Sequence, residues 1–216
     1  MHPNLYTVST MALTLFSLVL LLLSRRYCLR PYNPSYMKTF PIYTAVNVLA
    51  ELTAILCPSQ KKITYSLFTL FELLYLTWFL TRLIQSGRKR RLIWRLTSLS
   101  LLLNTYTLIK QGIDFTMAIA LLQECVILII PCLLYLREIF VLPPTLNLFR
   151  EPAFWMVTGF LFYFTTLIPT LLFSGYFAHL KMQDLADATY SVNNYVQICI
   201  YFLFINAMIC RRKISY

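Results

Sequence analysis

Long apolar stretches constrain this chain more than any other feature of its sequence. Seven of them fill most of the 216 residues, and each is long enough to cross roughly 30 Å of hydrocarbon as a helix. Backbone polar groups in lipid must be hydrogen-bonded within the protein, and these stretches lack the alternation of barrel strands, so helices are favoured. We therefore predict an all-α bundle of seven transmembrane helices, forming a single domain over residues 1–216. The expected spans are residues 5–24, 40–57, 63–85, 92–110, 115–136, 153–174 and 191–210.

The composition also indicates that lipid is the solvent of the chain. Hydrophobic residues make up 59% of the sequence and charged residues 12%, whereas a soluble domain is nearer half apolar and about a quarter charged. The first stretch does not resemble a cleavable signal peptide, because no basic segment precedes it and Arg25 and Arg26 follow it without a small-residue cleavage site.

Basic residues gather in alternate gaps between the expected spans. Of the 19 Lys and Arg residues, fifteen fall in one set of alternate gaps and four in the other. Cytoplasmic loops carry the excess of Lys and Arg, so we predict an outside N-terminus and a cytoplasmic C-terminus. The net charge of +11 does not indicate a nucleic-acid partner, because the basic residues lie at helix ends rather than along one face. Membrane lipid with anionic headgroups is the partner that these charges predict.

Three carboxylates lie inside apolar spans, whereas no Lys or Arg lies deep in any of them. A charged group at the centre of a transmembrane helix costs at least ~2.5–3.5 kcal/mol, so such residues need an explanation. Each acid falls within roughly 4 Å of the midpoint of its span, on the outer side. Other polar residues reach a similar level, and the candidate ligand-binding set is Glu51, Glu72, Glu124, Asn47, Asn104, Gln123, Asn194, Gln197 and Tyr163.

This polar layer has two interpretations. Its side chains could hydrogen-bond between helices as structural contacts, with each acid protonated. They could instead line a cavity that opens outward and binds a proton, a cation or an amine-bearing ligand. Three acids without an internal counter-charge favour a positive ligand over an anionic one. The sequence leaves both interpretations open.

Signatures of catalysis and of metal binding are missing from the sequence. There is no H-E-x-x-H, G-x-S-x-G or P-loop motif. The six cysteines form no C-x-x-C pair, so neither a disulfide framework nor a zinc site is expected. His179 has Asp184 and Asp187 nearby, a pattern that we interpret as ordinary loop polarity. We expect no cofactor and no catalytic or metal site, and the sequence favours a protein that is not an enzyme.

Two segments carry a resemblance to a known family. They are the stretch YSLFTLFELLY from Tyr65 to Tyr75, and Glu151-Pro152-Ala153-Phe154-Trp155 followed by Gly159, Leu161 and Tyr163. With the seven spans, they resemble an uncharacterised family of small bacterial seven-helix integral membrane proteins. The resemblance implies a multi-pass protein of the bacterial inner membrane and adds weight to Glu72, but it implies no activity.

Two functions remain open from the sequence alone. The first is a ligand-responsive or cation-responsive protein that signals or assembles through partners, with a cytoplasmic protein docking on the basic loop at residues 88–95. The second is a small transporter or channel that uses the acidic layer as a relay for protons or cations. The sequence shows no internal repeat, and repeats are common in transporters, so the first function is favoured.

Overall fold

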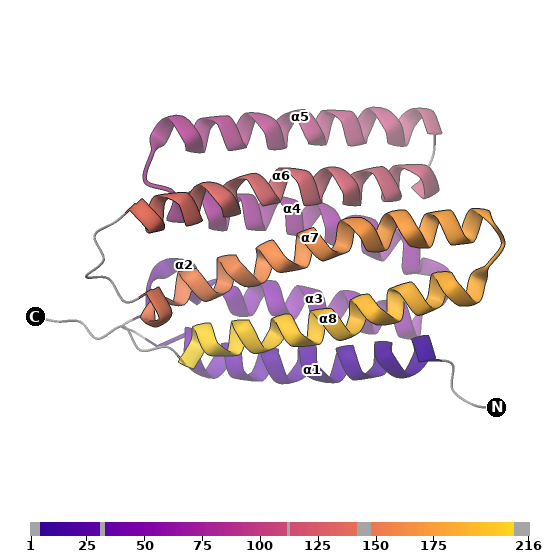
Figure 1. The fold of residues 1–216 in the computed structure, drawn as a ribbon, viewed down its shortest axis with the longest axis horizontal. Helices are drawn as coiled ribbons and strands as arrows, with labels where there is room; N and C mark the ends of the chain where they lie inside the picture. The colour runs from indigo at the N-terminus through magenta and orange to yellow at the C-terminus, as the bar shows by residue number, and fades with distance from the viewer. Residues whose placement is uncertain (1–4, 31–32, 112, 142–147, 210–216) are drawn as a thin grey trace, which may run out of the picture.

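The described residues of the chain are all-α. The computed structural model describes residues 5–30, 33–111, 113–141 and 148–209 (Figure 1). Within them, the long helices are α1 (Leu5–Cys28), α3 (Phe40–Leu56), α4 (Lys61–Leu83), α5 (Gly87–Gln111), α6 (Ile113–Val141), α7 (Pro152–His179) and α8 (Gln183–Ile209). Three short pieces are α2 (Ser35–Lys38), η1 (Pro58–Gln60) and η2 (Leu148–Arg150). Successive long helices run in opposite directions, so α1 begins at one end of the bundle and α8 finishes at the other (Figure 1).

Six of these long helices in the described part of the chain are long and apolar enough to cross a membrane. Their outward faces expose large apolar side chains, for example Leu22 on α1, Leu49 on α3 and Leu172 on α7. Outer faces of this kind suit lipid rather than water as the surrounding solvent. The predictions of an all-α bundle and of a multi-pass membrane protein are thus confirmed, whereas the orientation of the bundle stays a prediction.

Helix α5 is the exception among the long helices. It carries the fourth predicted span, residues 92–110, and is helical over 25 residues, but it is not among the six helices that could span a membrane. Its first turns hold the basic run from Arg88 to Arg95, and the following turns hold many hydroxyl and amide side chains. Six spans are therefore supported by length and composition, and the seventh stays a prediction.

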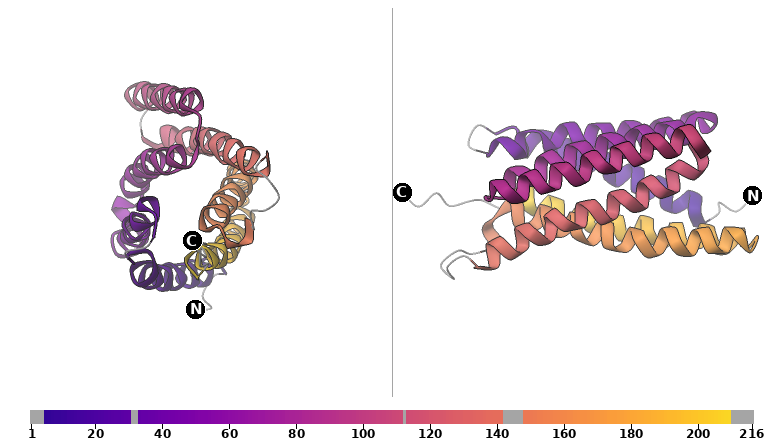
Figure 2. Two further views of the ribbon diagram at one scale, coloured as in Figure 1. Left: turned by 90° about the vertical axis from the view of Figure 1, so that its left-hand side faces the viewer. Right: turned by 90° about the horizontal axis from the view of Figure 1, so that it is seen from above.

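The six apolar helices form a closed ring, in the order α1, α3, α4, α6, α7 and α8, and α8 packs back against α1 (Figure 2, left). Helix α5 lies outside this ring and packs against α6 and α4. Polar contacts join it to both neighbours. The Thr97 hydroxyl lies 3.1 Å from that of Thr77 on α4, and Ser100 donates a 3.1 Å hydrogen bond to Gln123 on α6.

Buried aromatic rings close the interior of the ring at one end. We call this group the aromatic plug, and it consists of Phe40, Phe79, Phe160 and Phe204, all at most 3% exposed. Ring centroids lie 4.9 Å apart for Phe160 and Phe204 and 5.5 Å apart for Phe40 and Phe204. Rings at such separations attract each other beyond the effect of their buried area. The plug lies toward the end where α8 finishes.

Glycine at position 159 allows this packing. A Cβ atom at Gly159 would lie 2.6 Å from Cε1 of Phe204, well inside van der Waals contact. Because Phe204 is itself held between Phe40 and Phe160, its ring has little freedom to move away. The close approach of α7 and α8 at this level therefore requires glycine.

Candidate functional site

A cavity of about 350 Å³ lies inside the ring, on the other side of its middle from the aromatic plug. Its volume is within the range of about 300–1,000 Å³ that is typical of small-molecule sites. All six ring helices contribute to it. The lining residues are Tyr6, Leu13, Asn47, Glu51, Lys61, Tyr65, Phe68, Thr69, Glu72, Leu121, Tyr163, Leu167, Leu171, Tyr190, Asn194 and Gln197.

The mouth of the cavity lies at the end of the bundle where α1, α4 and α8 begin. Tyr6 and Lys61 belong to the first turns of α1 and α4, Tyr190 lies about two turns into α8, and all three line the cavity. We call this the open end. The opposite end, which we call the basic end, carries Arg25 and Arg26 of α1, Arg82 of α4 and the run from Arg88 to Arg91.

Helix α4 places a basic and an acidic side chain at the two ends of the cavity. Lys61, Tyr65, Thr69 and Glu72 follow one another at intervals of four, four and three residues, which puts them on one face of a helix. This face lines the cavity from its mouth at Lys61 to its floor at Glu72. The helical spacing of these residues thus places a basic side chain at the mouth of the cavity and an acidic side chain at its floor.

Glu51 ties three helices together at one side of the cavity. The side chain is 8% exposed. One carboxyl oxygen accepts a 2.8 Å hydrogen bond from the Ser17 hydroxyl on α1, and the other accepts a 3.1 Å bond from the Asn47 amide one turn away on α3. The same Asn47 amide donates to the Tyr201 hydroxyl on α8 at 3.3 Å. The acid is therefore held in place while it remains part of the cavity wall.

Glu72 is anchored to the neighbouring helix α3. Its Oε1 atom accepts a 2.6 Å hydrogen bond from the Tyr43 hydroxyl. The Tyr43 ring stacks on that of Tyr75 with centroids 5.2 Å apart, and the Tyr75 hydroxyl lies 3.2 Å from that of Thr39. Because the bond to Tyr43 occupies one carboxyl oxygen, the other is available to a group in the cavity.

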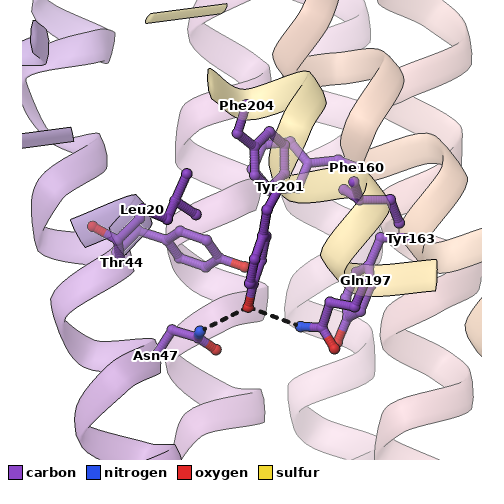
Figure 3. A pocket seen from close by; sticks show the side chains of 10 residues that line it. Leu20, Thr44, Asn47, Phe160, Tyr163, Gln197, Tyr201 and Phe204 are labelled. Carbon is purple, nitrogen blue, oxygen red and sulfur yellow. Dashed lines mark hydrogen bonds between the residues drawn. The ribbon is translucent and has the colours of Figure 1, made fainter. Parts of the chain in front are cut away.

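A much smaller void adjoins the cavity floor. It measures about 20 Å³ and shares Asn47, Tyr163 and Gln197 with the cavity. Figure 3 shows Tyr201 accepting hydrogen bonds from Asn47 and Gln197 at this level, with Phe160 and Phe204 of the aromatic plug on the far side. A void of this size holds about one water molecule. The polar interior therefore extends to the plug.

The structure brings most of the sequence-predicted residues to one place. The members of the candidate set that line the cavity are Glu51, Glu72, Asn47, Asn194, Gln197 and Tyr163. Asn194 also donates to Ser9 of α1 at 3.1 Å, which joins the two helices that close the ring. Side chains that were expected at one level of the membrane thus meet around one space.

Three members of the candidate set lie outside this lining. Gln123 accepts the hydrogen bond from Ser100 and so points toward α5. Asn104 belongs to α5 itself, outside the ring. Glu124 on α6 is 1% exposed, and its Oε1 atom has no hydrogen-bond partner among the described residues. The Glu124 carboxyl is within electrostatic range of Glu72.

Two residues of the site, one in the cavity lining and one behind it, are not among those expected from the sequence. The count of Lys and Arg by gap treats Lys61 as one more topology-determining charge at a helix end, yet it lines the mouth. Ser17 was not selected, although it donates to Glu51. The sequence does hold a signal for it, because Thr14, Ser17 and Ser24 recur at helical spacing on the buried face of α1.

Comparison with known proteins gave no relative for this chain. No protein-family model matches it, and searches of curated proteins and of solved structures found no match. The resemblance to small bacterial seven-helix proteins therefore stays a prediction. The structure supports the broader class, a multi-pass helical membrane protein with a polar cavity inside a ring of six helices.

Proposed function

We propose that this protein is a membrane receptor that binds a small amine-bearing ligand in the cavity. The observation that carries the proposal is that two carboxyl groups, of Glu51 and Glu72, line a ligand-sized space. Within the described lining, basic character is confined to Lys61 at the mouth. An unpaired carboxylate is costly at membrane depth, and an ammonium group bound near the floor would supply the counter-charge that the two acids lack.

Aromatic side chains support a cationic ligand. Tyr65 and Phe68 of α4, Tyr163 of α7 and Tyr190 of α8 all line the cavity. A cation over an aromatic face gains about 0.5–2 kcal/mol, and the gain is larger where water is excluded. Acids together with aromatic rings form the kind of wall that suits an organic ammonium ion better than a small hydrated metal ion.

The closed floor favours a receptor over an open channel. The aromatic plug lies between the cavity and the basic end, and the void next to it has room for about one water. A ligand would therefore enter and leave by the open end. The runner-up function, a proton- or cation-coupled transporter, needs a rearrangement that opens the plug.

We propose that the open end faces outward and the basic end faces the cytoplasm. The positive-inside rule supports this orientation. A cytoplasmic partner would then dock on the basic segment 88–95 at the start of α5, which is reachable because α5 lies outside the ring. Anionic lipid headgroups would contact the remaining charges. The membrane that we propose is the bacterial inner membrane, on the family resemblance alone.

The test is calorimetric titration of the purified protein in lipid nanodiscs with hexylamine, with empty nanodiscs as the blank. Saturable binding is expected. Glu72→Gln keeps the shape of the side chain and removes its charge, so we expect affinity to fall about tenfold or more, as for loss of a charge-assisted hydrogen bond.

Glu138→Gln is the matched control for this substitution. It makes the same chemical change at the basic end, where Glu138 pairs with Lys89 at 2.6 Å, and it should leave hexylamine affinity unchanged. Absence of saturable binding would overturn the proposal, as would equal affinity of the Glu72→Gln variant and the unmodified protein.

A further inference from the structure

We infer that the ligand is a zwitterion whose ammonium group lies at Glu72 and Glu51 and whose carboxylate is bound by Lys61. This inference rests on the proposed function, and it adds the second charge that the ligand carries. The observation behind it is the charge order along α4, with Lys61 in the mouth of the cavity and Glu72 at its floor.

The Lys61 ammonium has unused hydrogen-bonding capacity. Its Nζ atom contacts the Tyr6 hydroxyl at 3.2 Å and lies 5.6 Å from the centre of the Tyr6 ring. Within the described part of the chain, no carboxylate forms an ion pair with Lys61. A lysine ammonium has three N–H donors, so two remain for an anionic group.

Tyr6 also fixes where the ammonium lies. The aromatic face and the hydroxyl hold Lys61 against the first turns of α1, so that the charge borders the cavity. Lys62, the next residue, is exposed and does not line the cavity. Of these two adjacent lysines, one is thus directed toward the ligand space and the other away from it.

The separation of the charges suits one elongated molecule. Glu72 is eleven residues further along α4 than Lys61, which is roughly 16 Å along the helix axis. Both side chains border the same space. Glu51 lies at an intermediate level, because it precedes the last turn of α3 and η1 then leads directly to Lys61. A ligand with a short chain between amine and carboxylate would reach from Lys61 toward the acids.

Three probes of matched chain length separate the two charges: ε-aminocaproate carries both, hexylamine the amine alone, and caproate the carboxylate alone. Each is titrated by calorimetry into the protein in nanodiscs. We expect ε-aminocaproate to bind about three- to tenfold more tightly than hexylamine, as for one partly exposed ion pair. Caproate alone should not bind measurably, because the floor is acidic.

The variant Lys61→Gln should remove this preference. We expect it to weaken ε-aminocaproate about three- to tenfold without weakening hexylamine, which has no carboxylate for Lys61 to bind. Lys62→Gln is the matched control and should alter neither affinity. Folding of the variant is checked by its retained, saturable hexylamine binding.

The outcomes distinguish this inference from the proposed function. If hexylamine binds and depends on Glu72, but ε-aminocaproate binds no better and Lys61→Gln has no effect, the ligand is a simple amine and the zwitterion is ruled out. If neither amine binds, both proposals fail. Equal weakening by Lys61→Gln and Lys62→Gln would indicate a general surface-charge effect and would also overturn the inference.

Discussion

Two buried acids of this protein have opposite surroundings. Glu51 accepts hydrogen bonds from Ser17 and Asn47, so its polar atoms are satisfied by neighbouring helices. Glu124 is still more deeply buried, yet its Oε1 atom has no partner among the described residues and it lies in electrostatic range of Glu72. A buried polar atom without a partner costs about 1–3 kcal/mol. The two acids should therefore respond differently to the same substitution.

We expect Glu124→Leu to stabilise the protein. The substitution replaces the unsatisfied carboxyl with an apolar side chain of similar size, and the free energy of unfolding should rise by about 1–3 kcal/mol. The measurement is unfolding by heat or by a denaturing detergent in one fixed micelle. Glu124→Leu should leave hexylamine binding intact, because Glu124 does not line the cavity.

Glu51→Leu is the matched comparison, and we expect it to change the free energy of unfolding in the opposite direction. It leaves the Ser17 hydroxyl and the Asn47 amide without their acceptor, so stability should fall by about 1–3 kcal/mol in the same assay. If Glu124→Leu destabilised the protein as strongly as Glu51→Leu, Glu124 would have to be engaged by a bound group.

The sequence identified the buried acids but could not assign their directions. Intramembrane Glu and Asn residues stand out against apolar neighbours, and depth follows from counting residues. Whether a side chain faces the ring interior depends on how each helix is rotated against its neighbours. Glu72 and Gln123 were both expected in the cavity layer, yet Gln123 points to α5 because Ser100 is there to bond with it.

At the scale of one helix, α7 offers a test of the aromatic plug. Gly159→Ala places a Cβ atom 2.6 Å from the Phe204 ring, so we expect the free energy of unfolding to fall by about 1–3 kcal/mol. Gly175→Ala is the control on the same helix, because its new Cβ meets nothing within 4 Å. It should be neutral or stabilise by up to about 1 kcal/mol, the difference in helix propensity.

Thermal unfolding of both variants in the same detergent decides between these expectations. Equal stabilities would mean that Phe204 moves aside without cost and that the plug is looser than its ring contacts indicate. A selective loss in Gly159→Ala would show that α7 and α8 are locked together at this level.

Helix α5 shows where reasoning from single elements stops. Its length and its place between apolar neighbours predict a span, and the structure does contain a long helix there. Its position outside the ring cannot be read from the pattern of apolar and polar residues within α5 itself. It follows from Thr97 and Ser100 meeting polar partners on α4 and α6, which are contacts between segments distant in the sequence.

At the scale of the whole molecule, orientation is the main prediction. Among the described cysteines, Cys57 is exposed at the open end, between α3 and η1, and Cys28, Cys125 and Cys132 are buried. Cys199 is exposed on α8, within a span where lipid would shield it from a membrane-impermeant reagent. A membrane-impermeant maleimide added to intact cells should therefore label the protein, and Cys57→Ser should abolish that labelling. The basis is the excess of Lys and Arg at the other end.

A cysteine at the basic end provides the control for orientation. Ser86→Cys, just before α5 in a background with Cys57→Ser, should be labelled only after the cells are permeabilised. The reverse pattern, with Ser86→Cys labelled in intact cells, would place the open end in the cytoplasm and contradict an outward-facing cavity.

The helix count and the polar level were largely predictable, since both depend on composition and on the rise per residue. The ring and its mouth were not, because they depend on which helices become neighbours. Lys61 illustrates the difference. Its sequence context is that of any helix-end lysine, and its place at the cavity follows only from Tyr6 of α1 lying across from it.

The peripheral position of α5 has a consequence for symmetry. Helices α4 and α6 are neighbours in the ring and run in the same direction, because α5 carries the chain back between them (Figure 1). Helices α8 and α1 are also neighbours that run in the same direction. The ring therefore divides into two triplets, α1–α3–α4 and α6–α7–α8, whose helices follow the same order of directions. In six consecutive antiparallel helices without an extra helix such as α5, the second triplet would have the opposite orientation in the membrane to the first. Triplets of matching sense can be related by an axis along the membrane normal, which is the relation between the two halves of carriers built from parallel repeats. Uptake of radiolabelled hexylamine into sealed proteoliposomes would therefore separate a carrier from a receptor.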